Sequence, residues 1–102
     1  MPYIEASTVE ALLTQTLTWR TKAHKAYLLA VQISDAYVAK WESGEYTSTV
    51  SRTDAQARAS EDSRWQVAVS NNQMYDRFAQ RDAAVLSAIA NLVNANLLTV
   101  RD

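Results

Sequence analysis

The chain has 102 residues, of which 48% are hydrophobic and 21% are charged, and its formal net charge is −1. This length predicts one domain, and this composition is typical of a globular protein and excludes a disordered one. Because a protein needs a basic surface to neutralise phosphates, the near-neutral charge argues against a nucleic-acid partner. The sequence contains no cysteine, which excludes disulfides and thiolate metal sites.

No segment of the sequence has the pattern of a membrane span or of a classical secretion signal. The longest uninterrupted apolar run covers residues 26–31, which is far shorter than the roughly 20 residues that cross a bilayer. The N-terminus lacks a basic stretch followed by an apolar one. We therefore expect no membrane partner. The localisation stays open, and synthesis in the cytoplasm with later incorporation into a particle is compatible with these features.

The first long helix is predicted from about residue 8 to about residue 43. Ser7 and Glu10 match a capping box, in which each side chain would accept a hydrogen bond from the backbone N–H group of the other residue. Apolar side chains then recur on four of the seven positions of a heptad, and such a stripe is wider than one partner helix can cover. Ala23, Ala26 and Ala30 leave little bulk in the middle, where another helix could approach closely.

The reversal of the chain is predicted at Gly44, the only glycine in the sequence. Glycine adopts a positive φ without a steric penalty, which suits the residue that follows the end of a helix. Residues 44–52 are predicted to form the turn and an extended connector. The fold class that follows is all-α: an antiparallel hairpin of two long helices, completed into a bundle by oligomerisation.

The second long helix is predicted from about residue 53 to about residue 98. Either Ser51 or Thr53 can cap it, and Thr53 with Gln56 matches a second capping box. A break near Ser60 is left open. In the second half of this helix apolar side chains again follow heptad rows, one of which consists of Phe78, Val85 and Leu92.

No set of residues has the spacing of a catalytic or metal site. His24 is the only histidine, and the residues one turn before and after it are not metal ligands. The acid pairs Glu61–Asp62 and Asp76–Asp82 are explained by a helix start and by surface charge pairing. One glycine cannot build a phosphate-binding loop. We therefore expect no enzymatic activity, no cofactor, no metal and no small-molecule substrate.

Four polar residues fall on or beside rows that are otherwise apolar. A buried asparagine in a helix seam can fix the register and the number of helices. The other interpretation is that the apolar stripe drifts around the helix, so that these side chains reach water. The candidates for the register-setting role are Asn71, Asn72, Asp82 and Asn96.

Large apolar and aromatic side chains are candidates for an interface between chains, with core packing as the default interpretation. Tryptophan and tyrosine bury a large area while keeping one polar group, and both are common at protein interfaces. The predicted second helix is also the longer one, and roughly 13 Å of it would lack a partner at 1.5 Å per residue. We therefore expect partners that are second copies of the chain or other subunits of an assembly. The interface candidates are Leu12, Trp19, Leu28, Leu29, Val31, Val38, Trp41, Trp65, Tyr75 and Phe78.

A chain of about 100 residues with two helices and a central Trp-Glu-Ser-Gly segment, residues 41–44, resembles the WXG100 family of small secreted helical hairpins. In that family a Trp-x-Gly motif forms the turn, and the hairpins pair into four-helix dimers. The resemblance implies the same arrangement here. Two features depart from the family pattern: Gly44 stands three residues after the tryptophan, and Tyr75 is followed four residues later by Ala79 and not by the acid of the export signal.

These features favour a non-enzymatic structural or interaction protein. The preferred hypothesis is a small helical subunit of a larger assembly, such as an accessory or capsid-associated protein of a phage virion. One alternative is a secreted helical-hairpin dimer similar to the WXG100 proteins. A more remote alternative is a small helical regulator or inhibitor that binds another protein.

Overall fold

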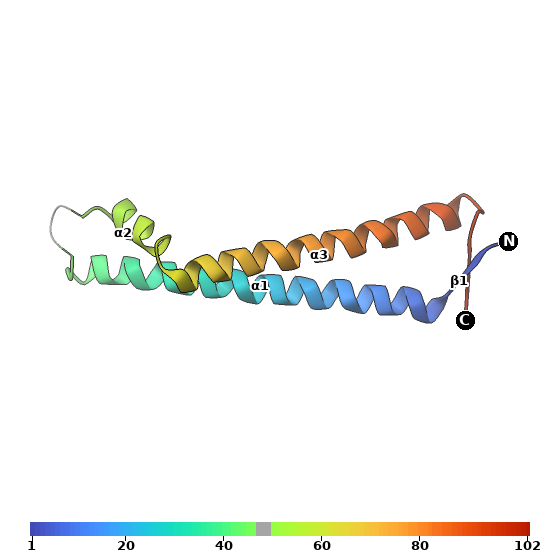
Figure 1. Ribbon diagram of the computed structural model, residues 1–102, viewed down its shortest axis with the longest axis horizontal. Helices are drawn as coiled ribbons and strands as arrows, with labels where there is room; N and C mark the ends of the chain where they lie inside the picture. Colours follow the sequence, from blue (N-terminus) through green and yellow to red (C-terminus); the bar gives the residue numbers. More distant parts are fainter. Residues whose placement is uncertain (47–49) are drawn as a thin grey trace. The chain divides into compact units, whose positions relative to one another are not determined.

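The computed structural model describes residues 1–46 and 50–102. In chain order these residues form five elements: β1 (Tyr3–Glu5), α1 (Ala6–Glu42), α2 (Arg52–Ala59), α3 (Ser63–Asn94) and β2 (Thr99–Arg101) (Figure 1). The predicted helical hairpin is confirmed, with α1 and α3 as its two long helices. The two short strands were not predicted.

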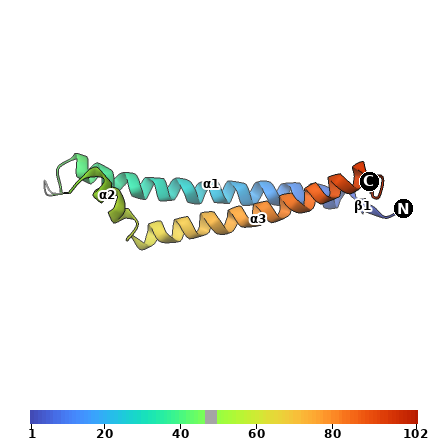
Figure 2. The same cartoon turned by 90° about the horizontal axis from the view of Figure 1, so that it is seen from above.

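The chain packs as two compact units. Both α1 and α3 contribute one segment to each unit. The terminal unit comprises Met1–Lys22 and Met74–Asp102, and the central unit comprises Ala23–Gln73. Within each unit the segments of α1 and α3 lie side by side (Figure 2).

The central unit is built on small side chains. Its buried hydrophobic residues are mostly alanines, and each of them is at most 7% exposed: Ala23, Ala30, Ile33, Val38, Ala55, Ala59 and Ala68. Two contacts in this unit join Tyr37 to Asp62 and Ala23 to Asn72, so α3 runs antiparallel to α1. Because alanine adds one methyl group, backbones that meet at alanines can approach closely, but they bury little apolar area per residue.

The terminal unit has an aromatic cluster between its two helices. The ring of Trp19 stacks on Tyr75 at 5.8 Å between centroids and meets Phe78 at 5.0 Å in a tilted arrangement. Lys22 places its Nζ atom 5.4 Å from the centroid of Trp19, where a cation is attracted by the face of the ring. Ala79 and Thr16 are buried in the same unit.

The two strands close the terminal unit at the ends of the chain. They pair in parallel, with Tyr3 opposite Thr99 and Glu5 opposite Arg101. This pairing corrects the predicted start of the first helix. Since β1 occupies the chain up to Glu5, α1 begins at Ala6, and Ser7 lies within its first turn and not at its cap.

The second helix, predicted over residues 53–98 with a break near Ser60 left open, is broken there and ends at Asn94. α2 ends at Ala59, and α3 begins at Ser63, because Asp62 caps α3: its carbonyl accepts from the N–H of Gln66, and its side chain accepts from the N–H of Arg64. α1 has 37 residues and α3 has 32, so the expected excess length of the second helix does not exist.

Of the two caps considered for residues 51–53, the structure has Ser51. Its side chain accepts from the N–H of Asp54, and the Asp54 carboxylate accepts from the N–H of Ser51, each at 3.1 Å. This reciprocal pair is a capping box two residues earlier than the Thr53 alternative, and it places Thr53 inside α2.

Both long helices end in the same way. After α1 the N–H of Gly44 donates to the carbonyl of Trp41, and the N–H of Glu45 donates to the carbonyl of Lys40. This is a Schellman motif, and Gly44 has the positive φ of 77° that its central residue requires. After α3 the same two bonds surround Asn96, which has a φ of 58°.

We predict that Gly44→Ala lowers the free energy of unfolding by about 1 kcal/mol, because an L-residue is strained in the left-handed region. Packing cannot contribute, since a Cβ atom built on Gly44 meets nothing within 4 Å. Gly44→Asn is the matched control and should lose less, because asparagine tolerates this conformation. Denaturant titration at one protein concentration measures both variants, and an alanine variant at least as stable as the parent contradicts the prediction.

Candidate functional site

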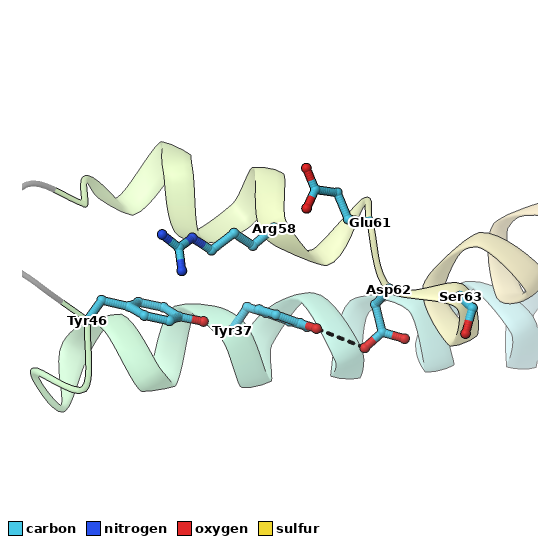
Figure 3. A pocket seen from close by; sticks show the side chains of 6 residues that line it. All are labelled: Tyr37, Tyr46, Arg58, Glu61, Asp62 and Ser63. Carbon is cyan, nitrogen blue, oxygen red and sulfur yellow. Dashed lines mark hydrogen bonds between the residues drawn. The ribbon is translucent and has the colours of Figure 1, made fainter.

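An open hollow of about 840 Å³ lies in the central unit, at the junction of α2 and α3 (Figure 3). The guanidinium of Arg58 lies 4.7 Å from the centroid of the Tyr46 ring, which fixes the cation over an aromatic face. The hollow is polar, because one cation, Arg58, and two acids, Glu61 and Asp62, line it. Its lining consists of Tyr37, Tyr46, Arg58, Glu61, Asp62 and Ser63.

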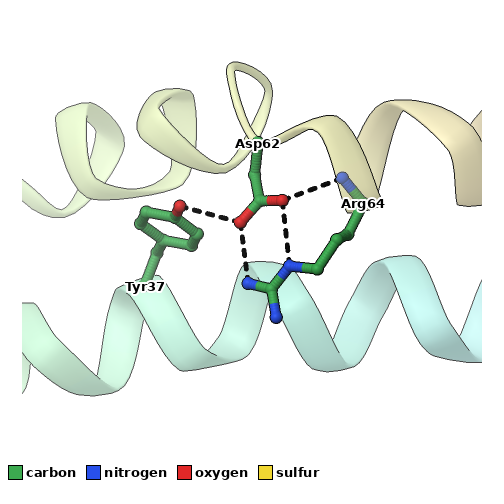
Figure 4. A network of polar contacts seen from close by, with 3 residues as sticks. All are labelled: Tyr37, Asp62 and Arg64. Atoms are coloured by element: carbon green, nitrogen blue, oxygen red, sulfur yellow. Dashed lines mark hydrogen bonds and ion pairs between the residues drawn. The ribbon is translucent and has the colours of Figure 1, made fainter.

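Asp62 is the centre of a hydrogen-bond network beside this hollow (Figure 4). The Tyr37 hydroxyl donates to Oδ2 at 2.9 Å. The guanidinium of Arg64 donates to both carboxylate oxygens, from Nη2 to Oδ2 at 2.8 Å and from Nε to Oδ1 at 3.1 Å. The backbone N–H of Arg64 donates to Oδ1 at 2.9 Å. The Asp62 side chain is only 10% exposed, so this network holds a nearly buried carboxylate at the start of α3.

The network moves the pKa values of Asp62 and Tyr37 further from neutral pH. The donors on Arg64 hold the pKa of the Asp62 carboxyl well below its usual range. The hydrogen bond to Asp62 raises the pKa of the Tyr37 hydroxyl above its ordinary value. Asp62 therefore stays ionised and Tyr37 stays protonated. A general acid or base needs a pKa near the working pH, so this pair is suited to joining helices and not to proton transfer.

We predict that the stabilisation from Asp62 disappears in acid. A carboxyl whose pKa is lower in the folded state stabilises the fold above its unfolded pKa, about 3.9, and this contribution is lost as the pH falls through the folded pKa. Asp62→Asn removes the charge but keeps a capping oxygen. The difference in unfolding free energy between parent and variant should be constant above about pH 5 and shrink below about pH 4.

The control for this titration is Asp76→Asn, which changes an exposed acid on the same helix that accepts a hydrogen bond from Gln80. This control variant should keep most of the pH dependence of the unfolding free energy that the parent shows. A parent and an Asp62→Asn variant with the same acid unfolding curve would show that the carboxylate does not stabilise the junction.

The remaining candidates for chemistry differ in their exposure to solvent. His24 is exposed, and its ring stacks on Tyr27 at 6.4 Å between centroids. Asp76 is exposed, whereas Asp82 is buried. Over residues 1–46 and 50–102 no group of three or more His, Asp or Glu side chains is arranged to hold a metal ion.

The four polar seam candidates have different environments. Asn72 is half-buried, and its Nδ2 donates to the carbonyl of Ala23 on α1 at 2.8 Å, which ties the two helices together at one register. Asn71 is half-buried beside it. Asp82 is 5% exposed, and its Oδ2 atom is buried without a hydrogen-bond partner. The seam prediction is wrong for Asn96, which lies beyond α3 and is exposed, because it is the positive-φ residue of the helix stop.

We predict that Asn72→Ala costs about 1 kcal/mol of unfolding free energy, the usual net contribution of one intramolecular hydrogen bond. Asn71→Ala is the matched control, since Asn71 precedes Asn72 and is also half-buried, and it should cost less. Denaturant titration distinguishes the two variants, and equal losses would contradict a register bond.

The interface candidates are placed in three environments. Only Leu28 and Leu29 are well exposed, at 43% and 48%. Val38 is 7% exposed, so its expected place at an interface is wrong, and it belongs to the core. Trp41 is half-buried, and its indole N–H donates to the carbonyl of Val50 at 2.7 Å. The other candidates are half-buried: Leu12, Trp19, Val31, Trp65, Tyr75 and Phe78.

Several more exposed side chains were missing from the predicted interface. Except for Val67, they belong to rows that the heptad pattern marks as apolar, but the pattern alone does not tell which row faces the partner helix within the hairpin. These side chains are 42–61% exposed: Leu13, Leu17, Tyr27, Val67, Val85 and Leu92.

Comparison of the chain with family models, with curated proteins and with solved structures returns no match. Within the part of the chain that the structure describes, none of the helices combines the length and the apolar character that crossing a membrane requires.

Proposed function

We propose that the protein is a non-enzymatic structural or interaction protein, a small helical subunit that completes its core against other subunits of an assembly. The observation that carries this proposal is the burial pattern. Among residues 1–46 and 50–102 no large side chain is less than 2% exposed. Many large apolar side chains lie at the surface instead, and such patches mark interaction sites in soluble proteins.

The chemistry of the polar hollow supports a role without catalysis. Asp62 and Tyr37 hold their charge states at neutral pH, and the Asp62 carboxylate has its acceptor sites filled by Arg64 and Tyr37. An accessory or capsid-associated protein of a phage virion is one assembly subunit of this kind: small, helical, close to neutral and rich in exposed apolar side chains.

A second candidate is a secreted hairpin dimer similar to the WXG100 proteins. It is favoured by one observation, the helical hairpin whose first helix ends at the residue 41–44 segment. A secretion assay separates the two candidates, since only the second requires the protein outside the producing cell, and detection in purified particles supports the first.

The assembly proposal predicts that the protein in a native extract migrates well above its own 11.4 kDa. Replacing Leu28 and Leu29 by glutamine should lower the size of these complexes, because both side chains are exposed and apolar. Gln32→Ala, at an exposed polar position of α1, is the control and should leave them unchanged. Size fractionation of the extract measures all three chains. A parent that migrates as a clean monomer and, once purified, binds no hydrophobic dye contradicts the proposal.

A further inference from the structure

The buried side chains of the two units differ in kind. Of the eight buried hydrophobic residues in the described part of the chain, seven belong to the central unit and one, Ala79, belongs to the terminal unit. The two buried polar residues, Thr16 and Asp82, both belong to the terminal unit. A segment with few buried apolar side chains opens at a lower free energy than the rest of a fold. By this criterion the terminal unit is the one that opens first.

Two polar atoms of the terminal unit are buried without a hydrogen-bond partner, Nε1 of Trp19 and Oδ2 of Asp82. The other carboxylate oxygen of Asp82 has an ionic contact with Nε of Arg81 at 3.7 Å. Arg81 is the preceding residue on the same helix and its side chain is 64% exposed, so this contact does not join α1 to α3. A buried polar atom without a partner favours any state in which water reaches it.

In the central unit the corresponding polar groups are paired across the hairpin. The Asp62 carboxylate, just before α3, accepts from the Tyr37 hydroxyl on α1. Asn72 on α3 donates to the carbonyl of Ala23 on α1. Separating the helices would break these bonds. Polar groups therefore favour the closed state of the central unit, whereas Trp19 and Asp82 oppose the closed state of the terminal unit.

The β1–β2 pair ties the two chain ends of the terminal unit together. The N–H of Thr99 donates to the carbonyl of Pro2 at 3.1 Å, and the guanidinium of Arg101 lies 4.5 Å from the centroid of the Tyr3 ring. Five of the six strand residues are exposed and only Ile4 is half-buried, so the pair adds little to a core. Its contribution is backbone hydrogen bonds and a cation–π contact that hold the two ends of the chain side by side.

We propose that the terminal unit opens by separation of its α1 and α3 segments, and that the β1–β2 pair is the latch that keeps it closed. Opening brings water to Nε1 of Trp19 and Oδ2 of Asp82, which offsets part of the apolar contact that is lost. The lost contact is mainly the aromatic cluster of Trp19, Tyr75 and Phe78. This inference is independent of the proposed function, because it concerns contacts within one chain.

Amide hydrogen exchange of the parent chain tests the opening without any substitution. The terminal unit is measured at residues 12–20 and 76–88, and the central unit at residues 27–38 and 68–73, all away from the helix ends. The terminal set should exchange about tenfold faster or more, since one unpaired buried polar group shifts an opening equilibrium by about that factor. Equal protection of the two sets overturns the proposal.

A reversible disulfide across the strand pair tests the latch, because the chain has no cysteine of its own. Ile4 and Val100 are partners in the strand register, and paired strands lie within the roughly 7 Å between Cα atoms that a disulfide can bridge. Oxidation of the double variant Ile4→Cys, Val100→Cys should slow exchange of the terminal set by about tenfold, and by more than it slows the central set. The reduced form of the same protein is the matched control. Failure to form the disulfide, or equal slowing of both sets, overturns the latch.

Asp82→Leu tests the contribution of the unpaired carboxylate. Leucine has the same branching and puts methyl groups in place of the two oxygens, so exchange of the terminal set should become about tenfold slower than in the parent. Asp76→Leu, at an exposed position of the same helix segment, is the control and should slow exchange by less. All chains are compared at one protein concentration. Faster exchange in Asp82→Leu than in the parent shows that the carboxylate stabilises the closed unit, and equal slowing by the two leucines shows a general effect on the helix; either result overturns the proposal.

Discussion

A helix in a hairpin can be covered by its partner along one stripe only, and this geometric limit governs the structure. The stripe of α1 that faces α3 in the central unit contains Ala23 and Ala30, both buried. Small residues there let the backbones approach closely, but a contact made by methyl groups removes little apolar area from water. The larger apolar side chains lie beside the stripe and stay partly exposed. Contacts between small side chains therefore hold the two helices together in this unit.

Local polar interactions therefore define where each helix starts and stops. Ser51 and Asp54 begin α2, Asp62 begins α3, and two Schellman motifs end α1 and α3. The junction at Asp62 also reaches across the central unit, since Tyr37 on α1 donates to its carboxylate. Because residues 1–46 and 50–102 contain no fully buried large side chain, these caps and cross-connections replace part of the specificity that side-chain packing gives elsewhere.

The features that could be predicted from the sequence are those encoded by local patterns. Heptad periodicity gives the two long helices, and a single glycine in the middle gives the reversal, because both signals lie within a few neighbouring residues. The break near Ser60 was left open, because an acid such as Asp62 can cap a new helix but can also lie on the exposed side of a continuous one. The capping residue was ambiguous for a similar reason: Ser51 and Thr53 both match the motif, and only the geometry of the connector selects one of them.

Contacts between distant residues could not be predicted in the same way. The heptad rows mark four apolar positions on α1, but they do not tell which of them face α3, and Val38 was a candidate for an interface although it is buried. Asn96 was placed in a seam because the apolar stripe continues to Leu98 in sequence, whereas α3 ends at Asn94. The parallel strands depend on pairing two three-residue segments from opposite ends of the chain, and neither segment alone has a strong strand signal.

The pairing of β1 with β2 has a consequence for the order of folding. Tyr3 and Thr99 lie near opposite ends of the chain, so their pairing closes the longest loop in the molecule and carries a high entropic cost. Helical turns and the contact between Trp41 and Val50 involve residues that are close in sequence, and such contacts form early. We therefore expect the strand pair to form late, and its amide hydrogens should exchange with solvent sooner than those at the middle of the helices.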